Sequence, residues 1–291
     1  MFLSEPGDDF VPVGDHLNTL HCGRLVKAAG VTMKISPQRR QFIKQSICVA
    51  AATGAAGLSA TAAAETHGRG INIDPNKLSI GIFLYPNMTM LDAYGPLQVL
   101  AVSRQFNVFT FAKHAKPLPS DAHVDLLPHY GFADCPNIDV LIVPGSANPI
   151  EQIKDVEVIS RLREIGDKAK YVTSVCTGSL ILAETGLLDG YQTAVHWAYA
   201  DALKKYPKVT HVNQRVVKDR NRISGGGVTS GLDFAFTLVA EFAGKGRAQA
   251  LELLLEYDPQ PPFNTGNHNT TPKALKAAVQ SKVYEIGKGL F

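Results

Sequence analysis

The stretch 171–190, YVTSVCTGSLILAETGLLDG, constrains the fold most, because it joins a strand to a helix through one cysteine. Residues 171–175 are apolar and β-branched, as in a buried strand, and 179–185 have the composition of a helix. Between them, segment 174–178 (Ser-Val-Cys-Thr-Gly) has the small-x-nucleophile-x-Gly form of a nucleophile elbow. Small residues are needed there because the turn is too sharp for bulky side chains. The stretch therefore predicts that Cys176 lies at the end of a strand.

Cys176 is a candidate nucleophile because this turn would place its sulfur at a helix N-terminus. Unpaired N–H groups and the helix dipole favour a thiolate there. The dipole contributes up to about 2 kcal/mol, which would lower the pKa of a cysteine from about 8.5 to about 7. The alternative is that Cys176 is a small buried hydrophobic residue, as free cysteines often are. The local pattern alone does not decide between these interpretations.

Strand-like and helix-like segments alternate through the rest of the chain. Strands are predicted at 77–85, 107–112 and 139–143, and as a hairpin within 209–224 that turns at 219–221. Helices are predicted at 88–102, 155–168, 193–206, 229–242, 247–257 and 273–286. Strands that alternate with helices of this length imply an α/β fold, with a parallel sheet covered on both faces.

Three predicted strand ends carry groups suited to catalysis, and ligands bind such sheets outside the carboxyl ends of the strands. The first strand leads to Asp92, the third ends at Gly145-Ser146, and the elbow strand ends at Cys176-Thr177. These residues offer a nucleophile, an acid or base, and backbone N–H groups for an anion. If Asp92 lies close to Cys176, the pair is expected to share one proton, as a thiolate and a neutral acid.

Each of these residues also has a purely structural interpretation. Asp92 could cap the helix that it begins, and Thr177 could simply start the helix after the cysteine. His196 could be a hydrogen-bonded core histidine. The glycines at 225–227 favour a tight turn before a helix over a phosphate cradle, because neither GxGxxG nor a P-loop lysine accompanies them. The histidines and cysteines show no HExxH and no CxxC, so neither a metal nor a cofactor is expected.

The charge balance gives no electrostatic case for nucleic-acid binding. The net charge is +3, and beyond residue 64 there are 23 Lys and Arg against 22 Asp and Glu. With 45% apolar and 19% charged residues, the body has the composition of an ordinary globular protein. Residues 77–291 are predicted to form one domain, preceded by a linker at 65–76.

Residues 1–64 are predicted to be a leader with a twin-arginine export signal. Segment 36–44, SPQRRQFIK, carries the arginine pair, and a mildly apolar, alanine-rich run follows at 47–64. Three alanines fit the small-x-small rule, so cleavage is expected before Glu65 and the product is expected to be periplasmic or otherwise exported. An uncleaved membrane anchor is less favoured because alanine and glycine make the run weakly apolar. The residues before Cys48 do not form a lipobox.

Two expectations follow from this leader. Met33 is predicted to be the true start, because MKISPQRRQFIK is an ordinary leader, and N-terminal sequencing of the precursor would test this. Only Cys135 and Cys176 would survive processing. Both are expected to be free thiols, because a bridge through the elbow cysteine would abolish its chemistry.

Six blocks in order along the body resemble the ThiJ/PfpI superfamily. They are FLYPNMTMLDAYGPLQVL (83–100), VLIVPGSAN (140–148), SVCTGSLILAETGLLDG (174–190), HWAYADAL (196–203), SGGGVTSGLDFAFTLVAEFAG (224–244) and LLEYDPQPPFNTG (254–266). The resemblance implies a class I glutamine amidotransferase-like fold, which is a three-layer flavodoxin-like sandwich with a mostly parallel sheet and a cysteine nucleophile elbow. Leu-Asp-x-x-Gly-Pro, Cys-Thr-Gly and Tyr-Asp-Pro-Gln-Pro-Pro-Phe point to its isonitrile hydratase-like subgroup.

The resemblance also implies roles for individual residues. The family's nucleophile falls on Cys176, and its essential acidic position falls on Asp92, where protease-like and deglycase-like relatives have Glu. Thr177 stands where PfpI proteases have His, which argues against a Cys-His protease. All three residues are therefore catalytic candidates, with Thr177 expected to position the substrate or a water molecule.

Three further residues are implied in oxyanion or substrate binding. The family's Pro-Gly-Gly turn corresponds to Pro144-Gly145-Ser146, so the second glycine is lost while its backbone N–H is kept. His196 fits the spacing of a histidine that recurs twenty residues after the nucleophile in parts of the superfamily. Gly145, Ser146 and His196 therefore complete the predicted site, and no metal ligand is among them.

The implied activity is that of a hydro-lyase, which adds water to an isonitrile to give an N-substituted formamide through a Cys176 thioimidate. Another hydrolase or deglycase of the superfamily is an alternative, as is a non-catalytic, redox-responsive thiol protein or ligand-binding module. Relatives fused to a helix-turn-helix domain act as regulators, but the chain ends at Phe291, which argues against a transcription factor. The expected partner is a small-molecule substrate, with no nucleic acid and no stable membrane anchor after processing. Many relatives form dimers, so a homodimer is compatible with the sequence.

Overall fold

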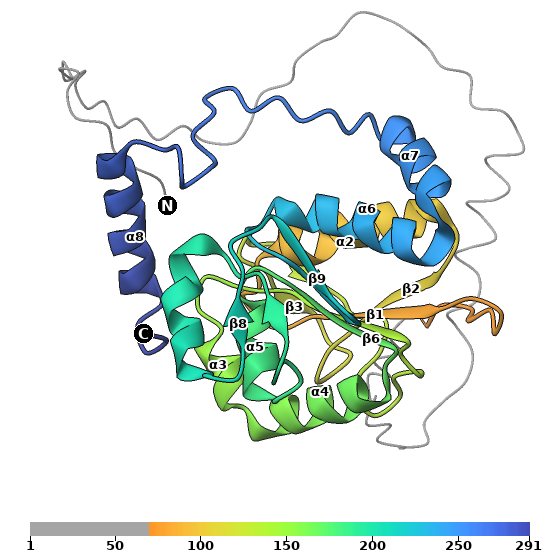
Figure 1. Ribbon diagram of the computed structural model, residues 1–291. Coiled ribbons are helices and arrows are strands. Elements are labelled where there is room, and N and C mark those ends of the chain that lie inside the picture. The colour runs from red at the N-terminus through yellow and green to blue at the C-terminus, as the bar shows by residue number, and fades with distance from the viewer. Residues whose placement is uncertain (1–69) are drawn as a thin grey trace, which may run out of the picture. The chain divides into compact units, whose positions relative to one another are not determined.

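Residues 70–291 are described by the structure, a computed structural model, and they form a sheet between layers of helices (Figure 1). The sheet has six strands in the order β2-β1-β5-β6-β10-β9. Neighbours are parallel, except that β9 runs antiparallel to β10. The strands are β1 (Ser79–Phe83), β2 (Asn107–Phe111), β5 (Val140–Val143), β6 (Tyr171–Val175), β9 (Val216–Asp219) and β10 (Arg222–Gly225). This arrangement confirms the predicted α/β sandwich with a mostly parallel sheet.

The sequence of the central strands explains why both faces of the sheet are covered. All five residues of β1 and all four of β5 are buried, although their side chains point alternately to opposite faces. Continuous apolar runs of this kind are typical of parallel sheets enclosed by helices. The predicted hairpin is also present, since β9 and β10 pair across the turn at 220–221.

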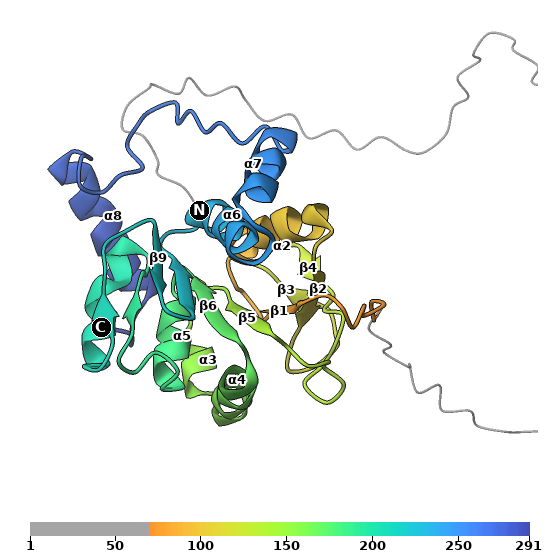
Figure 2. The ribbon, with the colours of Figure 1, turned by 45° about the vertical axis from the view of Figure 1, so that its right-hand side comes forward.

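Two groups of helices enclose the sheet, and a further helix packs beside them (Figure 2). Helices α2 and α6 pack together on one face, and α7 packs against α6. The opposite face is covered by α3, α4 and α5, with the 3₁₀ helix η1 beside α5 and with α8 packed against η1. The helices are α2 (Met90–Ser103), α3 (Ile150–Lys154), α4 (Val156–Lys168), α5 (Gly178–Glu184), η1 (Trp197–Lys205), α6 (Ser230–Ala243), α7 (Lys245–Leu254) and α8 (Lys273–Ile286).

The segment 193–206 contains the predicted helix, and a short strand precedes it. Thr193 pairs with His211 in a small two-stranded sheet. The imidazole of His196 then caps the helix that follows, so η1 begins only at Trp197 and is a 3₁₀ helix. The remaining short strands are β3 (Leu118–Pro119), β4 (Asp125–Leu126), β7 (Gln192–Thr193) and β8 (Thr210–His211).

The predicted leader at 1–64, with its export signal and start, lies outside the described residues. Residues 65–69, the first part of the predicted linker at 65–76, also lie outside them. Segment 70–76 is tied to the domain, because the Tyr130 hydroxyl accepts a hydrogen bond from the Ile71 N–H (2.9 Å) and donates one to the Ile71 carbonyl (3.2 Å). The last part of the predicted linker therefore contacts the body.

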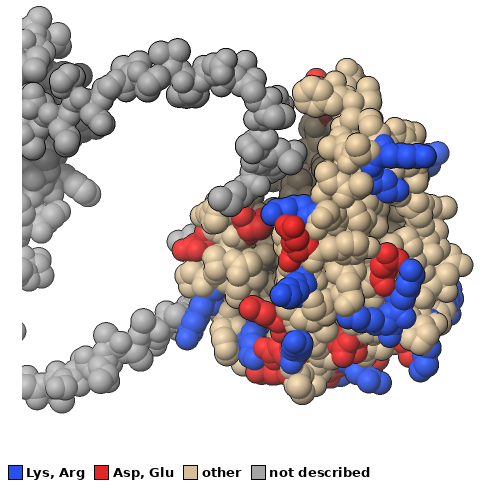
Figure 3. All heavy atoms as spheres, turned by 90° about the vertical axis from the view of Figure 1, so that its left-hand side faces the viewer, with Lys and Arg blue, Asp and Glu red and all other residues tan. Residues whose placement is uncertain are grey.

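The surface of the described part is mixed in charge where it can be viewed. On the face in Figure 3, Lys and Arg side chains alternate with Asp and Glu, and neither sign forms a continuous patch. Within residues 70–291, no helix has both the length and the apolar character needed to cross a bilayer.

The strand order determines where the candidate residues meet. Strands β1, β5 and β6 are neighbours in the sheet, and all three run in the same direction. Their carboxyl ends therefore lie side by side, and Asp92, Gly145 and Cys176 follow these three ends in the chain. The sheet topology brings together residues that are more than 80 positions apart in the sequence.

Candidate active site

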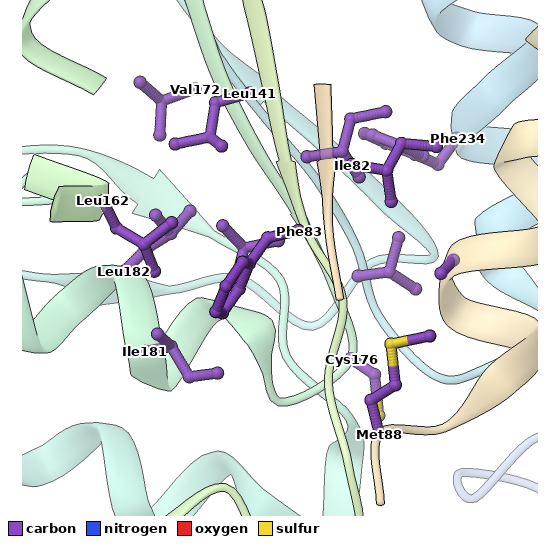
Figure 4. Close-up of a cluster of buried hydrophobic side chains, with 14 of the residues drawn as sticks. Ile82, Phe83, Met88, Leu141, Leu162, Val172, Cys176, Ile181, Leu182 and Phe234 are labelled. Atoms are coloured by element: carbon purple, nitrogen blue, oxygen red, sulfur yellow. The ribbon is translucent and has the colours of Figure 1, made fainter. Parts of the chain in front are cut away.

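Cys176 occupies a strained turn between β6 and α5. Its φ is +59°, in the left-handed region that residues with a side chain rarely adopt. Its N–H donates to the Gly225 carbonyl (3.0 Å), which extends the pairing of β6 with β10 by one residue. The side chain is 4% exposed and belongs to the buried core shown in Figure 4. The structure thus shows the predicted elbow geometry, in which the chain turns sharply and the sulfur stays buried.

The elbow also explains the glycine two residues later. A Cβ atom on Gly178 would lie 2.0 Å from the Val143 carbonyl oxygen, a separation that no side chain can adopt. The absence of a side chain at this position lets α5 start directly against the end of β5. The required small residue is therefore a consequence of backbone packing between neighbouring elements.

Backbone strain at Cys176 predicts an unusual order of stabilities. Glycine normally destabilises a structured position by about 0.5–1 kcal/mol relative to alanine, but a left-handed conformation costs a residue with a Cβ about 1–2 kcal/mol. We therefore expect Cys176→Gly to be more stable than Cys176→Ala by about 1 kcal/mol in urea denaturation. The same pair of substitutions at Cys135, whose φ is not positive, should show the ordinary order, with alanine the more stable. Equal behaviour at both positions would contradict the strained elbow.

Asp92 lies in the first turn of α2 but does not cap it. The carboxyl group is fully buried, and its Oδ2 accepts a hydrogen bond from the Gly145 N–H at 2.9 Å. The cap is supplied by another segment, because the Asp121 carboxylate accepts a hydrogen bond from the Met90 N–H (2.9 Å). The helix-cap interpretation of Asp92 is therefore wrong, and its carboxyl group is directed toward the ends of β5 and β6.

Gly145 allows these groups to approach each other. A Cβ atom at this position would lie 2.4 Å from the Thr177 nitrogen, 2.5 Å from the Thr177 hydroxyl oxygen and 3.0 Å from Asp92 Oδ2. The first contact is with backbone, which cannot move aside without shifting the elbow. Gly145 is therefore needed for its small size as well as for its N–H.

Thr177 fixes the loop after β5 rather than pointing freely into the site. Its hydroxyl oxygen accepts a hydrogen bond from the Ser146 N–H (2.8 Å) and donates one to the Ser146 carbonyl (2.7 Å). The residue is fully buried, so these groups have no access to water. The N–H groups of Gly145 and Ser146 are thus both engaged within the protein. The predicted oxyanion role of these two amides is not available in this conformation, whereas the Thr177 N–H acts to lower the pKa of Cys176.

These two hydrogen bonds should make the Thr177 hydroxyl contribute measurably to the free energy of unfolding. Thr177→Val keeps the shape but leaves the N–H and carbonyl of Ser146 buried without partners, at a cost of about 1–3 kcal/mol each. We expect a loss of about 2–4 kcal/mol in urea denaturation. Thr177→Ser retains the hydroxyl and should lose only about 1 kcal/mol, for one buried methyl group. Similar losses in the two variants would show that the hydroxyl does not hold the loop.

The site raises the pKa values of both its acidic groups. Burial raises the pKa of Asp92 to about 7, while the Gly145 amide and the Cys176 thiol act in the opposite direction. Burial and the neighbouring Asp92 raise the pKa of Cys176 well above its ordinary value, and the Thr177 amide only partly offsets this. Burial therefore favours the protonated form of both groups, and the sharing of one proton between them stays a prediction.

Two groups that sequence reasoning missed also lie at the site. The Tyr85 side chain is 2% exposed, its hydroxyl donates to the Pro144 carbonyl (3.1 Å), and Asp92 and Cys176 both raise its pKa. Asp121 raises the pKa values of Asp92 and Cys176 through its charge. The position of Tyr85 at the end of a buried strand was a usable signal, whereas nothing near Asp121 in the sequence indicates its contact.

His196 performs the structural role that the sequence left open. Its Nδ1 accepts a hydrogen bond from the Ala198 N–H (3.3 Å), and burial lowers its pKa to about 4, so it is neutral at pH 7. Within residues 70–291, no hydrogen bond joins His196 to Cys176 or Asp92. The described part also contains no group of three or more His, Cys, Asp or Glu side chains placed to hold a metal ion. Cys135 and Cys176 are both free thiols.

The fold and the site together define an α/β protein with a cysteine at a nucleophile elbow and a buried carboxyl group beside it. A model of the DJ-1/PfpI family matches residues 78–241, which is more than half of the chain. The chain belongs to this family, as the six sequence blocks indicate.

The curated relatives of this chain differ in what they do. Isonitrile hydratase of Pseudomonas putida is 42% identical over 198 residues, which cover 68% of this chain and 86% of that protein. The transcriptional regulator GbdR of Pseudomonas aeruginosa is 26% identical, and the match covers 72% of this chain but 59% of the regulator.

Solved structures show the same fold. A ThiJ/PfpI family protein from Pseudomonas syringae has a TM-score of 0.70 and 36% identity, over 81% of this chain and 96% of that chain. Drosophila melanogaster DJ-1beta has a TM-score of 0.54 and 21% identity, over 62% of this chain and 98% of that chain. At that identity the second likeness concerns the fold alone.

Proposed function

We propose that the protein is an isonitrile hydratase, which converts an isonitrile and water into an N-substituted formamide. The observation that carries the proposal is the buried pair of Cys176 and Asp92, positioned by Gly145 at three adjacent strand ends. The 42% identity to an isonitrile hydratase supports the substrate class. The site suits a small, weakly polar substrate, since isonitriles have no hydrogen-bond donor and the cysteine is nearly enclosed.

The first half of the reaction joins the substrate to sulfur. Asp92, ionised above about pH 7, removes the thiol proton of Cys176 as the sulfur attacks the terminal carbon of the isonitrile. A C–S bond forms, and the lone pair left on that carbon takes the proton back from Asp92. The product is a thioimidate, R–N=CH–S, on Cys176, and Asp92 is again a carboxylate.

The second half releases the product with water. Asp92 removes one proton from a water molecule as the water oxygen attacks the thioimidate carbon and the C=N electron pair moves to nitrogen. The second proton of that water passes to the nitrogen, and the C=O bond forms as the C–S bond breaks. The sulfur leaves with the proton from Asp92, and the formamide R–NH–CHO departs. One water is consumed and the enzyme is regenerated. Thr177 holds the loop of Ser146 in place throughout and directs its own N–H toward the sulfur.

The burial and the raised pKa of Cys176 argue against the non-catalytic, redox-responsive alternative. Thiols that sense oxidants are exposed and have low pKa values. Cys176 is 4% exposed, and burial together with Asp92 raises its pKa. These properties suit a cysteine that becomes reactive only when a base removes its proton during attack.

The proposal is tested by measuring formamide production from a panel of small alkyl and aryl isonitriles with the purified protein. We expect turnover of at least one member, unchanged in a Cys135→Ala variant, because Cys135 lies outside the site. Turnover of glyoxal-adduct or peptide substrates without any turnover of isonitriles would instead support a deglycase or hydrolase.

A further inference from the structure

Two buried polar atoms at the candidate site have no hydrogen-bond partner. Within residues 70–291 only three buried side-chain atoms lack one, namely Asp92 Oδ1, Ser146 Oγ and Arg161 Nε. The first two belong to the same site, because Asp92 Oδ2 accepts a hydrogen bond from the N–H of Gly145, the residue directly before Ser146. Unsatisfied buried groups are rare in proteins, and one explanation is a bound polar molecule.

The position of the Ser146 hydroxyl is fixed by its surroundings. Thr177 holds both the N–H and the carbonyl of Ser146, so its backbone cannot rotate away. The side chain is 3% exposed and lies near the hydroxyl of Tyr85, whose proton is donated to the Pro144 carbonyl and not to Ser146. Burial raises the pKa of Tyr85, and the charges of Asp92 and Cys176 raise it further. Tyr85, Asp92, Ser146 and Cys176 therefore share one buried environment.

A water molecule is the smallest partner that satisfies both atoms. The free Asp92 oxygen accepts a hydrogen bond, while a serine hydroxyl can donate or accept, so one water can bridge them. We propose that Ser146 Oγ and Asp92 Oδ1 together bind the water molecule that attacks the substrate adduct on Cys176. This inference rests on the proposed function, and it gives Ser146 a role through its side chain rather than its amide.

The proposed water takes part in the second half of the reaction. Asp92 takes one proton from the water while the hydroxyl of Ser146 keeps hydrogen-bonding its oxygen, and the new C–O bond forms as the C=N bond becomes a single bond. The second proton of the water passes to the nitrogen, and the proton from Asp92 goes to the departing sulfur as the C=O bond forms. Formation of the thioimidate needs no water, so the first half of the reaction should not depend on the Ser146 hydroxyl.

The test separates these two halves in the full-length protein. Ser146→Ala is compared with the control Ser103→Ala, another buried serine, whose hydroxyl donates to the Leu100 carbonyl and accepts from the Gln105 N–H. Each variant is mixed with one equivalent of isonitrile and quenched at intervals. Intact mass spectrometry then follows the adduct on Cys176. We expect Ser146→Ala to form the adduct at nearly the wild-type rate and to lose it about 10–100-fold more slowly. Loss of the adduct at the wild-type rate would overturn the proposal.

A second measurement needs no substrate and therefore separates failure of this inference from failure of the proposed function. Alkylation of Cys176 by iodoacetamide is followed against pH by peptide mass spectrometry. Without the hydroxyl, the water is held less firmly and the Asp92 carboxylate is less stabilised. The rise in rate near pH 7 should then move up by about half a pH unit or more in Ser146→Ala. If the wild type turns over no isonitrile, the hydratase proposal fails, and an unshifted alkylation profile would refute water binding by Ser146.

Discussion

Replacing Cys176 by alanine is expected to lower isonitrile turnover by about a thousandfold or more. The substitution removes the only group in the site that can form the covalent intermediate, and loss of a nucleophile alone costs enzymes at least this much. The measurement is formamide production under saturating isonitrile, with unfolding curves recorded for the same samples. Alanine has a Cβ, as cysteine does, so the substitution adds no backbone strain at this left-handed position and the variant should fold.

The control for this prediction is Cys135→Ala, which removes the other described thiol. Cys135 is partly buried, and burial raises its pKa to about 12, so it stays protonated and inert at neutral pH. Turnover at the wild-type level in Cys135→Ala and its loss in Cys176→Ala would assign the reaction to the elbow. Retained turnover in Cys176→Ala would refute the covalent mechanism.

Replacing Asp92 by asparagine is the second large effect, with an expected loss of about 10²–10⁴-fold, the usual contribution of a general base. In the wild type, kcat/KM should rise with pH through about 7, because only the ionised carboxylate can remove the thiol proton. The groups that face this carboxyl are Cys176, Tyr85 and the charge of Asp121. The inflection near pH 7 should be absent in Asp92→Asn. An unchanged pH profile in the variant would contradict the role of Asp92.

Asp92→Asn is expected to raise stability at pH 8, although it lowers turnover. The pKa of Asp92 is raised from 3.8 to about 7 in the folded protein, so between these values the folded state holds a proton that the unfolded state has lost. The stability of the wild type therefore falls as pH rises from about 4 to about 7, by at most about 4 kcal/mol. Asp92→Asn lacks this penalty and should gain stability relative to the wild type at pH 8 but not at pH 4. A difference that does not depend on pH would indicate that Asp92 is not buried in its charged form.

The sequence predicted the sheet and the elbow because both depend on local patterns. Continuous apolar runs located the buried strands, and the small residues around Cys176 located the turn. The helix bounds of 273–286 were predicted correctly, since 14 residues lie between clear breakers. The sequence indicated a helix within 193–206, but it showed neither that this helix is a 3₁₀ helix nor that Thr193 before it pairs with His211.

The sequence indicated which residues meet at the site better than it indicated their contacts and protonation. Asp92, Gly145 and Cys176 follow strand ends, and the strand order makes those ends adjacent. The sequence could not show that Thr177 occupies the Ser146 N–H, because that contact joins two loops 31 residues apart. It also could not show how strongly burial raises the pKa values of Asp92 and Cys176, since the extent of burial is a property of the whole fold.

The most direct test of the central claim is to trap and map the intermediate. Wild-type protein is mixed with isonitrile, quenched in acid within milliseconds and digested, and the peptide containing Cys176 is examined by mass spectrometry. We predict that this peptide gains the mass of one isonitrile molecule, and that the adduct decays at the rate at which the N-substituted formamide appears. Formamide that accumulates with no adduct on Cys176, at an undiminished rate in Cys176→Ala, would contradict the account.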